Sequence, residues 1–144
     1  MDESRLEISA LRAMPFFADL GPEDLERILA VGEVVAFAEG DVIVREGDVG
    51  DAMYIVLEGV AEVDVGGRFH RLRAGNFFGE MALITAKKRM ATVRAVEPVR
   101  AFRIPAGDFQ SFLLDHPRVA LSMLRAVVER LREVEERIDA WVGS

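Results

Sequence analysis

Glu80 and Arg89 are the two residues whose types and spacing point most directly to chemistry. They lie in the segment GEMALITAKKRMATV, residues 79–93, where three consecutive cations, Lys87, Lys88 and Arg89, interrupt a mostly apolar stretch. The planar guanidinium of an arginine matches the oxygens of a phosphate group. A carboxylate only accepts hydrogen bonds, so Glu80 suits a neutral hydroxyl such as that of a ribose. A site that contains both groups would bind a sugar phosphate.

The residues that follow Gly79 are expected to begin a short helix. The first amide N–H groups of a helix have no partner within it, and together with the helix dipole they favour an anion. Gly79 carries no side chain, so a ligand can approach its backbone closely. The sequence therefore predicts an anion cradle, with Arg89 reached after a short loop.

Two kinds of hydrophobic pattern precede and surround this segment. Residues 4–31 have helical spacing, and Pro22 with the acids that follow it marks a helix start. Residues 33–104 form short runs rich in Val, Ile and Phe, which is typical of an antiparallel sandwich or barrel. Turn signals recur at Glu39-Gly40-Asp41, Glu46-Gly47-Asp48, Glu58-Gly59 and Gly66-Gly67.

Helical spacing returns over residues 106–143, with a break at Pro117. In the last helix, apolar residues alternate at spacings of three and four, which predicts a heptad seam. The seam residues are Leu124, Val127, Leu131, Val134, Ile138 and Trp141. We therefore expect one domain over residues 1–144, made of a helical cap, a β part interrupted by residues 78–92, and C-terminal helices.

The composition argues against several classes of function. The chain has 144 residues and a formal charge of −7, so general affinity for nucleic acid or an anionic membrane is not expected, although a pocket for one phosphate is allowed. Its acidic N-terminus lacks a secretory signal, and no run of about 18 apolar residues predicts a membrane span. With no cysteine either, the sequence predicts a soluble, cytoplasmic protein.

Residues 78–93 resemble the phosphate-binding cassette of cyclic nucleotide-binding domains. That cassette reads Phe-Gly-Glu-x-Ala-Leu, five residues, then Arg-x-Ala-Thr or Ser. The matching residues are Phe78, Gly79, Glu80, Ala82, Leu83, Arg89, Ala91 and Thr92. Upstream, residues 40–59 are similar to the first strands of the family, and residues 11–28 to the helical entry of catabolite-activator-type domains. The resemblance covers about residues 11–131.

The resemblance implies a β jelly roll flanked by helices and a role for each matched residue. Arg89 would pair with the cyclic phosphate, and Glu80 would accept from the ribose 2′-OH. The backbone amides of Ala82 and Met90 would donate to phosphate oxygens, and Gly79 would lie near the ribose. The implied ligand-binding set is Phe78, Gly79, Glu80, Met81, Ala82, Arg89, Met90, Ala91 and Thr92. None has a covalent role, so neither an enzyme nor a cofactor is expected.

Two departures from the family pattern bear on the ligand. Lys88 stands where the family often has proline, so the loop loses one rigid φ and gains charge. Met90 stands where members that favour cGMP commonly have a threonine that bonds the guanine. The sequence therefore favours cAMP over cGMP. The adenine would be held by apolar contact and the C-terminal helix, with Val134, Glu135 and Trp141 as candidates to cap it.

The seam predicts a parallel homodimer, as the resemblance to catabolite-activator-type domains also implies. The helix would be roughly 35 Å long, more than a small roll can cover, and Arg130 would lie opposite Glu135 of the partner chain. The seam could also be an ordinary amphipathic face packed on the roll. Leucine at its first position leans toward higher oligomers in isolated coiled coils. Since the sequence ends at residue 144, the output is expected in a protein effector or a longer parent.

Three other interpretations stay open at this point. The chain could be a dimerisation or interaction module whose pocket no longer binds nucleotide, although Glu80 and Arg89 are both present. An enzyme would need a nucleophile paired with a base, which no pattern indicates. A metal-binding cupin would need clustered histidines, whereas His70 and His116 are far apart.

Overall fold

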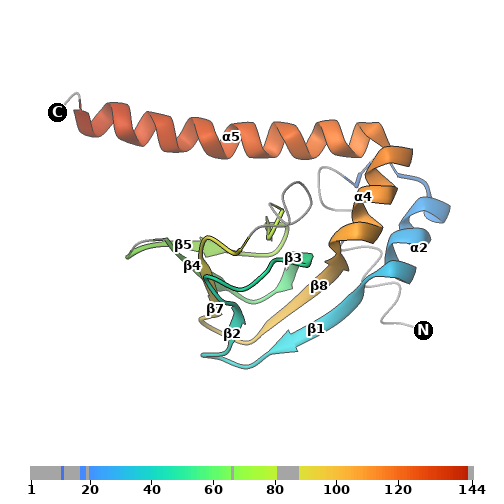
Figure 1. Ribbon diagram of the computed structural model, residues 1–144, viewed down its shortest axis with the longest axis horizontal. Helices are drawn as coiled ribbons and strands as arrows, with labels where there is room; N and C mark the ends of the chain where they lie inside the picture. The colour runs from blue at the N-terminus through green and yellow to red at the C-terminus, as the bar shows by residue number, and fades with distance from the viewer. Residues whose placement is uncertain (1–10, 12–16, 19, 66, 81–87, 143–144) are drawn as a thin grey trace.

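Two four-stranded antiparallel sheets form a β roll with helices along one side (Figure 1). The computed structural model describes residues 11, 17–18, 20–65, 67–80 and 88–142, with the backbone alone at 65 and 134–142. The strand order is β1-β8-β3-β6 in one sheet and β2-β7-β4-β5 in the other. The strands are β1 (Glu33–Phe37), β2 (Val42–Val44), β3 (Ala52–Glu58), β4 (Ala61–Val65), β5 (Arg68–Leu72), β6 (Phe77–Phe78), β7 (Thr92–Ala95) and β8 (Val99–Pro105).

Strands β3 and β8 of the first sheet are buried on both faces and so separate two cores. Successive side chains of a strand point to opposite faces, and in β3 the run from Ala52 to Val56 is buried throughout. One core fills the roll and includes Tyr54, Phe78 and Val93. The other lies between the sheet and the helices and includes Ile55, Phe77 and Phe102. Phe77 and Phe78 therefore connect β6 to both cores.

Three described helices pack on the outer face of this sheet. They are α2 (Pro22–Val31), α4 (Ala106–Asp115) and α5 (Pro117–Val142). Leu25 and Ile28 of α2, Phe109 of α4 and Met123 of α5 contribute to the outer core. Figure 1 shows α5 running across the top of the roll, from α4 toward the end where β4 and β5 lie.

The structure confirms the predicted β roll with flanking helices. The helix start at Pro22 and the break at Pro117 are found where the sequence placed them. Gly40, Gly47, Gly59 and Gly67 of the predicted turns have φ between 83° and 91°, a region that only glycine enters easily. Strand β6 was not predicted. The helix expected after Gly79 falls on residues 81–87, which lie outside the described residues.

The sequence predicts neither a membrane span nor a metal site. No described helix is long and apolar enough to cross a membrane. No three His, Cys, Asp or Glu side chains gather there in a way that could hold a metal ion. His70 lies on β5, and His116 lies between α4 and α5, so the two histidines are on separate elements.

Candidate functional site

A cavity of about 320 Å³ opens between the second sheet, β6 and α5. Ligand pockets of proteins begin at roughly this size. Its walls are mostly apolar, and its charged groups are Glu80, Lys88, Arg89 and Arg130. The remaining lining residues are Val44, Gly50, Val63, Leu72, Phe77, Phe78, Gly79, Met90, Ala91 and Val93. The cavity thus combines an apolar wall with a few charged groups, as sites for small organic ions do.

Arg89 is a half-buried cation that contacts no carboxylate among the described residues. Its Nη2 donates to the carbonyl of Ala52 at the start of β3, over 2.8 Å. Its backbone is held by the turn after β2, since its N–H donates to Asp48 O and its C=O accepts from Gly47 N. One of the five N–H groups of the guanidinium is used by Ala52, so the others can bind an anion.

Gly79 lies directly against the guanidinium of Arg89. It has a φ of +84°, and a Cβ atom placed on it would stand 2.6 Å from Arg89 Nη1 and 2.9 Å from Ala52 O. Both distances are shorter than van der Waals contact, so only glycine fits here without displacing the arginine or β3. The structure therefore brings the backbone of Gly79 and the side chain of Arg89 together.

Glu80 meets the cavity from the end of β6 and contacts Arg130 of α5. Arg130 Nη1 lies 3.4 Å from Glu80 Oε1, and its Nη2 donates to Phe77 O over 2.7 Å. The same guanidinium sits over the Phe77 ring, 4.1 Å from its centroid, which adds a cation–π attraction. The carboxylate of Glu80 can still accept a hydrogen bond from a hydroxyl group. Through Arg130, α5 contacts β6 and the residue that follows it.

The other residues of the predicted set differ in where they lie. Phe78 stacks on Tyr54 with ring centroids 5.0 Å apart and also lines the cavity, as do Met90, which is 66% exposed, and Ala91. The Thr92 hydroxyl accepts from the Glu46 N–H over 3.0 Å, so it fixes the turn after β2. Met81 and Ala82 lie outside the described residues.

Sequence reasoning missed Arg130 as a member of this site. The heptad register placed it opposite Glu135 of a partner chain, whereas in the structure its guanidinium lies on Phe77 and Glu80 of its own chain. In the sequence, Arg130 is only a cation on the predicted C-terminal helix. The sequence does not show which part of the roll that helix packs against. The apolar wall of Val44, Val63, Leu72 and Val93 was also missed.

A second and larger cavity, of about 570 Å³, lies between α4 and α5. Its walls are almost entirely apolar and include Leu113, Met123 and Leu124. Glu80 is the only charged residue among the described ones that line it, and a carboxylate repels a phosphate. The smaller cavity beside Arg89 is therefore the candidate site for an anionic ligand.

The predicted seam and base-capping residues lie on α5. Leu124 and Leu131 are 58% and 57% exposed and Val127 is 37% exposed, so the roll of the same chain leaves them largely uncovered. The backbone of α5 continues to Val142. The side chains of the remaining predicted residues, Val134, Glu135, Ile138 and Trp141, lie outside the described residues.

The chain matches a known protein family and several known sequences. The family model of the cyclic nucleotide-binding domain matches residues 34–116. The chain is 37% identical over 115 residues to a cAMP-dependent protein kinase regulatory subunit of Blastocladiella emersonii, covering 76% of this chain and 28% of that protein. It is 38% identical over 118 residues to a cyclic nucleotide-gated potassium channel of Rhizobium etli, covering 82% of this chain and 33% of the channel.

A solved structure extends the likeness to the fold. The catabolite activator protein of Thermus thermophilus superposes with a TM-score of 0.76 at 28% identity, over 89% of this chain and 63% of that one. The chain spans about a third or less of the two curated relatives. The family match at 34–116 includes Gly79, Glu80 and Arg89 and most of the cavity wall. On this match, the chain belongs to the cyclic nucleotide-binding domain family.

Proposed function

We propose that this chain is a cytoplasmic regulatory module that binds cAMP in the cavity beside Arg89. The observation that carries the proposal is the half-buried guanidinium of Arg89, which faces a cavity and contacts no carboxylate among the described residues. A cation withdrawn from water without a counter-ion is costly, and a bound phosphate would compensate its charge. Glu80, which also lines the cavity, supplies the acceptor for a ribose hydroxyl.

The preference for cAMP rests on the residues near the base. Met90 lines the cavity next to Arg89 and offers only a weak sulfur acceptor, so it does not donate a hydrogen bond to guanine. The apolar wall of Val44, Val63 and Leu72 suits a flat purine. The described lining contains no serine, threonine, cysteine or histidine that could act as a nucleophile or base. We therefore propose that the ligand is bound without being converted.

The proposed signal passes from Glu80 to α5 through Arg130. The Glu80 carboxylate lies 3.4 Å from Arg130. A ribose hydroxyl that donates to Glu80 would therefore compete with Arg130 for this carboxylate. Arg130 also holds Phe77 O, so a shift of the segment at the end of β6 moves the helix that carries the arginine. A ligand shifts this equilibrium only by its differential affinity for the two arrangements of α5. The output would belong to an effector or to a fused domain.

Calorimetric titration of the purified chain with cAMP and cGMP tests this function. We expect cAMP to bind at least about tenfold more tightly than cGMP, because one missing hydrogen bond to the base changes affinity by roughly that factor. 5′-AMP, which has the same base and sugar but an open phosphate, serves as the control and should bind more weakly. No heat and no thermal shift with any of the three, for a folded protein free of copurified nucleotide, would favour the interaction-module interpretation.

We further propose that α5 pairs with α5 of a second copy of the chain. The observation that favours this is the exposure of Leu124 and Leu131, 58% and 57%, on a helix of 26 residues. Sedimentation velocity should show a dimer, and Leu124→Lys with Leu131→Lys should convert it to a monomer, since each lysine places a charge in the seam. Leu114→Lys is the matched control, because Leu114 is 84% exposed on α4 and outside the seam. A wild-type monomer would contradict this arrangement.

A further inference from the structure

Two stripes of mostly apolar residues line the larger cavity, the one of about 570 Å³ between α4 and α5. On each helix the lining residues are three or four positions apart, which places them on one face of that helix. They are Gln110, Leu113 and Leu114 on α4 and Ala120, Met123, Leu124 and Val127 on α5. Stripes of this kind normally pack directly on another element. Here the space between them is large enough for a drug-sized ligand.

The cavity extends from the outer core to the surface. Met123 on its wall is 6% exposed, and Leu113 packs against the outer core. Leu114 and Leu124, by contrast, are 84% and 58% exposed. An apolar ligand in the cavity would remove part of this exposed apolar surface from water, which favours binding.

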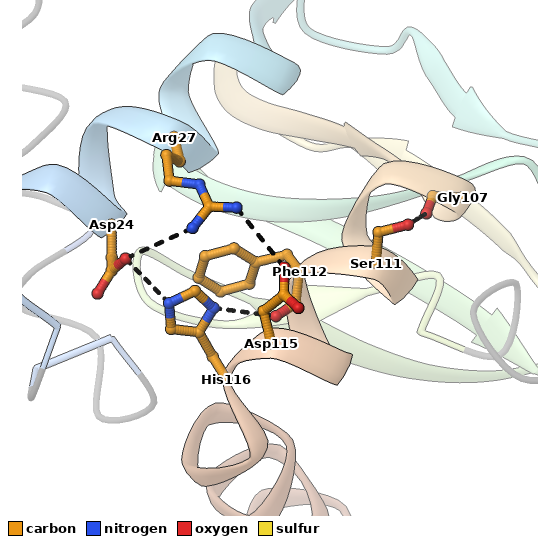
Figure 2. Close-up of polar contacts among 7 residues, drawn as sticks. All are labelled: Asp24, Arg27, Gly107, Ser111, Phe112, Asp115 and His116. Carbon is orange, nitrogen blue, oxygen red and sulfur yellow. Dashed lines mark hydrogen bonds and ion pairs between the residues drawn. The ribbon is translucent and has the colours of Figure 1, made fainter.

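Residues outside this cavity hold α4 in place. Phe112 of α4 is buried in the outer core, and the end of the helix contacts α2 (Figure 2). Arg27 of α2 lies 3.6 Å from Asp115, and Asp24 Oδ1 lies 2.9 Å from Nε2 of His116, the residue between α4 and α5. None of these residues lines the cavity. α4 can therefore keep its position without closing onto α5.

Glu80 supplies the only charge among the described residues that line this cavity. Its side chain is 25% exposed, and its Oε1 lies 3.4 Å from Arg130 Nη1. A carboxylate has about four acceptor positions, so this contact leaves acceptor capacity, and Arg130 itself does not line the larger cavity. A protonated amino group would complement the carboxylate, whereas an anion would be repelled. Glu80 also lines the smaller cavity beside Arg89.

We infer that the cavity between α4 and α5 is a second ligand site, for a small amine with an apolar body, and that its ligand weakens binding in the cavity beside Arg89. The apolar body would lie between the two stripes, and the amino group would donate to Glu80. The regulatory link rests on the proposed function, because it concerns the affinity for cAMP. A carboxylate held by an ammonium group in one cavity is a poorer acceptor for a ribose hydroxyl in the other.

Calorimetric titration of the nucleotide-free chain with three naphthyl compounds tests the site. Naphthylethylamine, naphthylethanol and naphthylacetate share one apolar body and carry a positive, a neutral and a negative end group. We expect the amine to bind about threefold to tenfold more tightly than the alcohol, and the acid to bind most weakly. Since ligands of this size bind with a Kd on the order of 0.1–1 mM, the titrations extend to about 5 mM. No binding, or equal binding of all three, would overturn the amine site.

Two variants locate the bound amine in the cavity. Ala120→Phe fills part of the space and should lower the affinity for naphthylethylamine by about tenfold or more. Leu121→Phe is the matched control, because it adds a ring to an exposed position of the same helix that does not line the cavity. Leu114→Lys, at a position 84% exposed, should weaken the amine through charge repulsion without disturbing the core. Unchanged affinity in both Ala120→Phe and Leu114→Lys would place the amine elsewhere and overturn the site.

Glu80→Gln tests the recognition of the amino group. We expect the variant to bind naphthylethylamine no more tightly than naphthylethanol, with the affinity for the alcohol changed by less than about threefold. Glu23→Gln removes the same charge from an exposed position of α2 and should keep the preference for the amine. An equal loss of preference in the two variants would mean that the overall negative charge, and not Glu80, attracts the amine.

Titration with cAMP in the presence of the amine tests the regulatory link. With naphthylethylamine near saturation, the affinity for cAMP should fall about threefold to tenfold, and saturating cAMP should lower the affinity for the amine by the same factor. Naphthylacetate at the same concentration should have no effect. Unchanged or tighter cAMP binding with the amine bound would overturn the link. Absence of cAMP binding under every condition would refute the proposed function and the link, and the nucleotide-free titrations would still decide the second site.

Discussion

Replacing Arg89 by alanine is expected to weaken cAMP binding by about 30-fold to several thousand-fold. Truncating one partner of a desolvated charge pair costs roughly 2–5 kcal/mol of binding free energy. This cost corresponds to a loss of affinity of about 30-fold to several thousand-fold. Arg89 fits this case because it is half-buried, is oriented by Ala52 O at 2.8 Å, and has no described carboxylate partner. Calorimetric titration of the variant against the wild type measures the loss directly.

Two further variants show whether the loss of affinity is caused by removing the planar guanidinium of Arg89. Arg89→Lys keeps the charge but loses the planar donors, so its affinity should lie between those of the wild type and Arg89→Ala. Arg94→Ala is the matched control, because Arg94 is an arginine of β7 whose described bond is to Gly40 O and which does not line the cavity. A change below about threefold in Arg89→Ala is what an exposed ion pair would give, and it would contradict the assigned role.

The fold could be predicted from the sequence because its signals are local. Glycines at 40, 47, 59 and 67 mark turns through their positive φ, and the strands between them carry the Val- and Ile-rich runs that favour sheets. Strand β6 was not predicted because it consists of two adjacent phenylalanines, Phe77 and Phe78. Two residues are too few to show the alternation of apolar and polar side chains that indicates a strand. Their pairing with β3 is a long-range contact that no local pattern contains.

The candidate site was only partly predictable for the same reason. Gly79, Glu80 and Arg89 were found because they lie within one segment with a recognisable spacing. Arg130 comes from a helix that begins after the roll is complete, and its contacts with Phe77 and Glu80 depend on how α5 crosses the sheet. That direction depends on how α5 packs with α4 and the first sheet in the outer core, and not on the periodicity of α5. The heptad register therefore predicts an apolar seam but does not reveal the partner of this arginine.

Gly79→Ala should reduce cAMP affinity by about 10-fold to 100-fold, or about 1.4–2.8 kcal/mol. The new methyl group would stand 2.6 Å from Arg89 Nη1 and 2.9 Å from Ala52 O. The guanidinium is the end of a flexible side chain and moves more easily than the backbone of β3, so it would leave the position from which it faces the cavity. The contact with Ala52 O would remain and add to the cost in stability. The same methyl group would also keep a ligand away from the Gly79 backbone. Calorimetric titration measures the affinity, and thermal unfolding measures the cost to the fold.

Gly75→Ala separates the contact from the backbone strain. Gly75 has a φ of +91°, close to the +84° of Gly79, but nothing within 4 Å of the position of a Cβ atom. Both variants place an L-residue at positive φ and should lose about 1–2 kcal/mol of stability from that strain. Only Gly79→Ala should lose affinity as well. Equal affinities for the two variants would mean that the close approach of Gly79 to Arg89 does not hold the guanidinium in place, and that Ala52 O alone orients it.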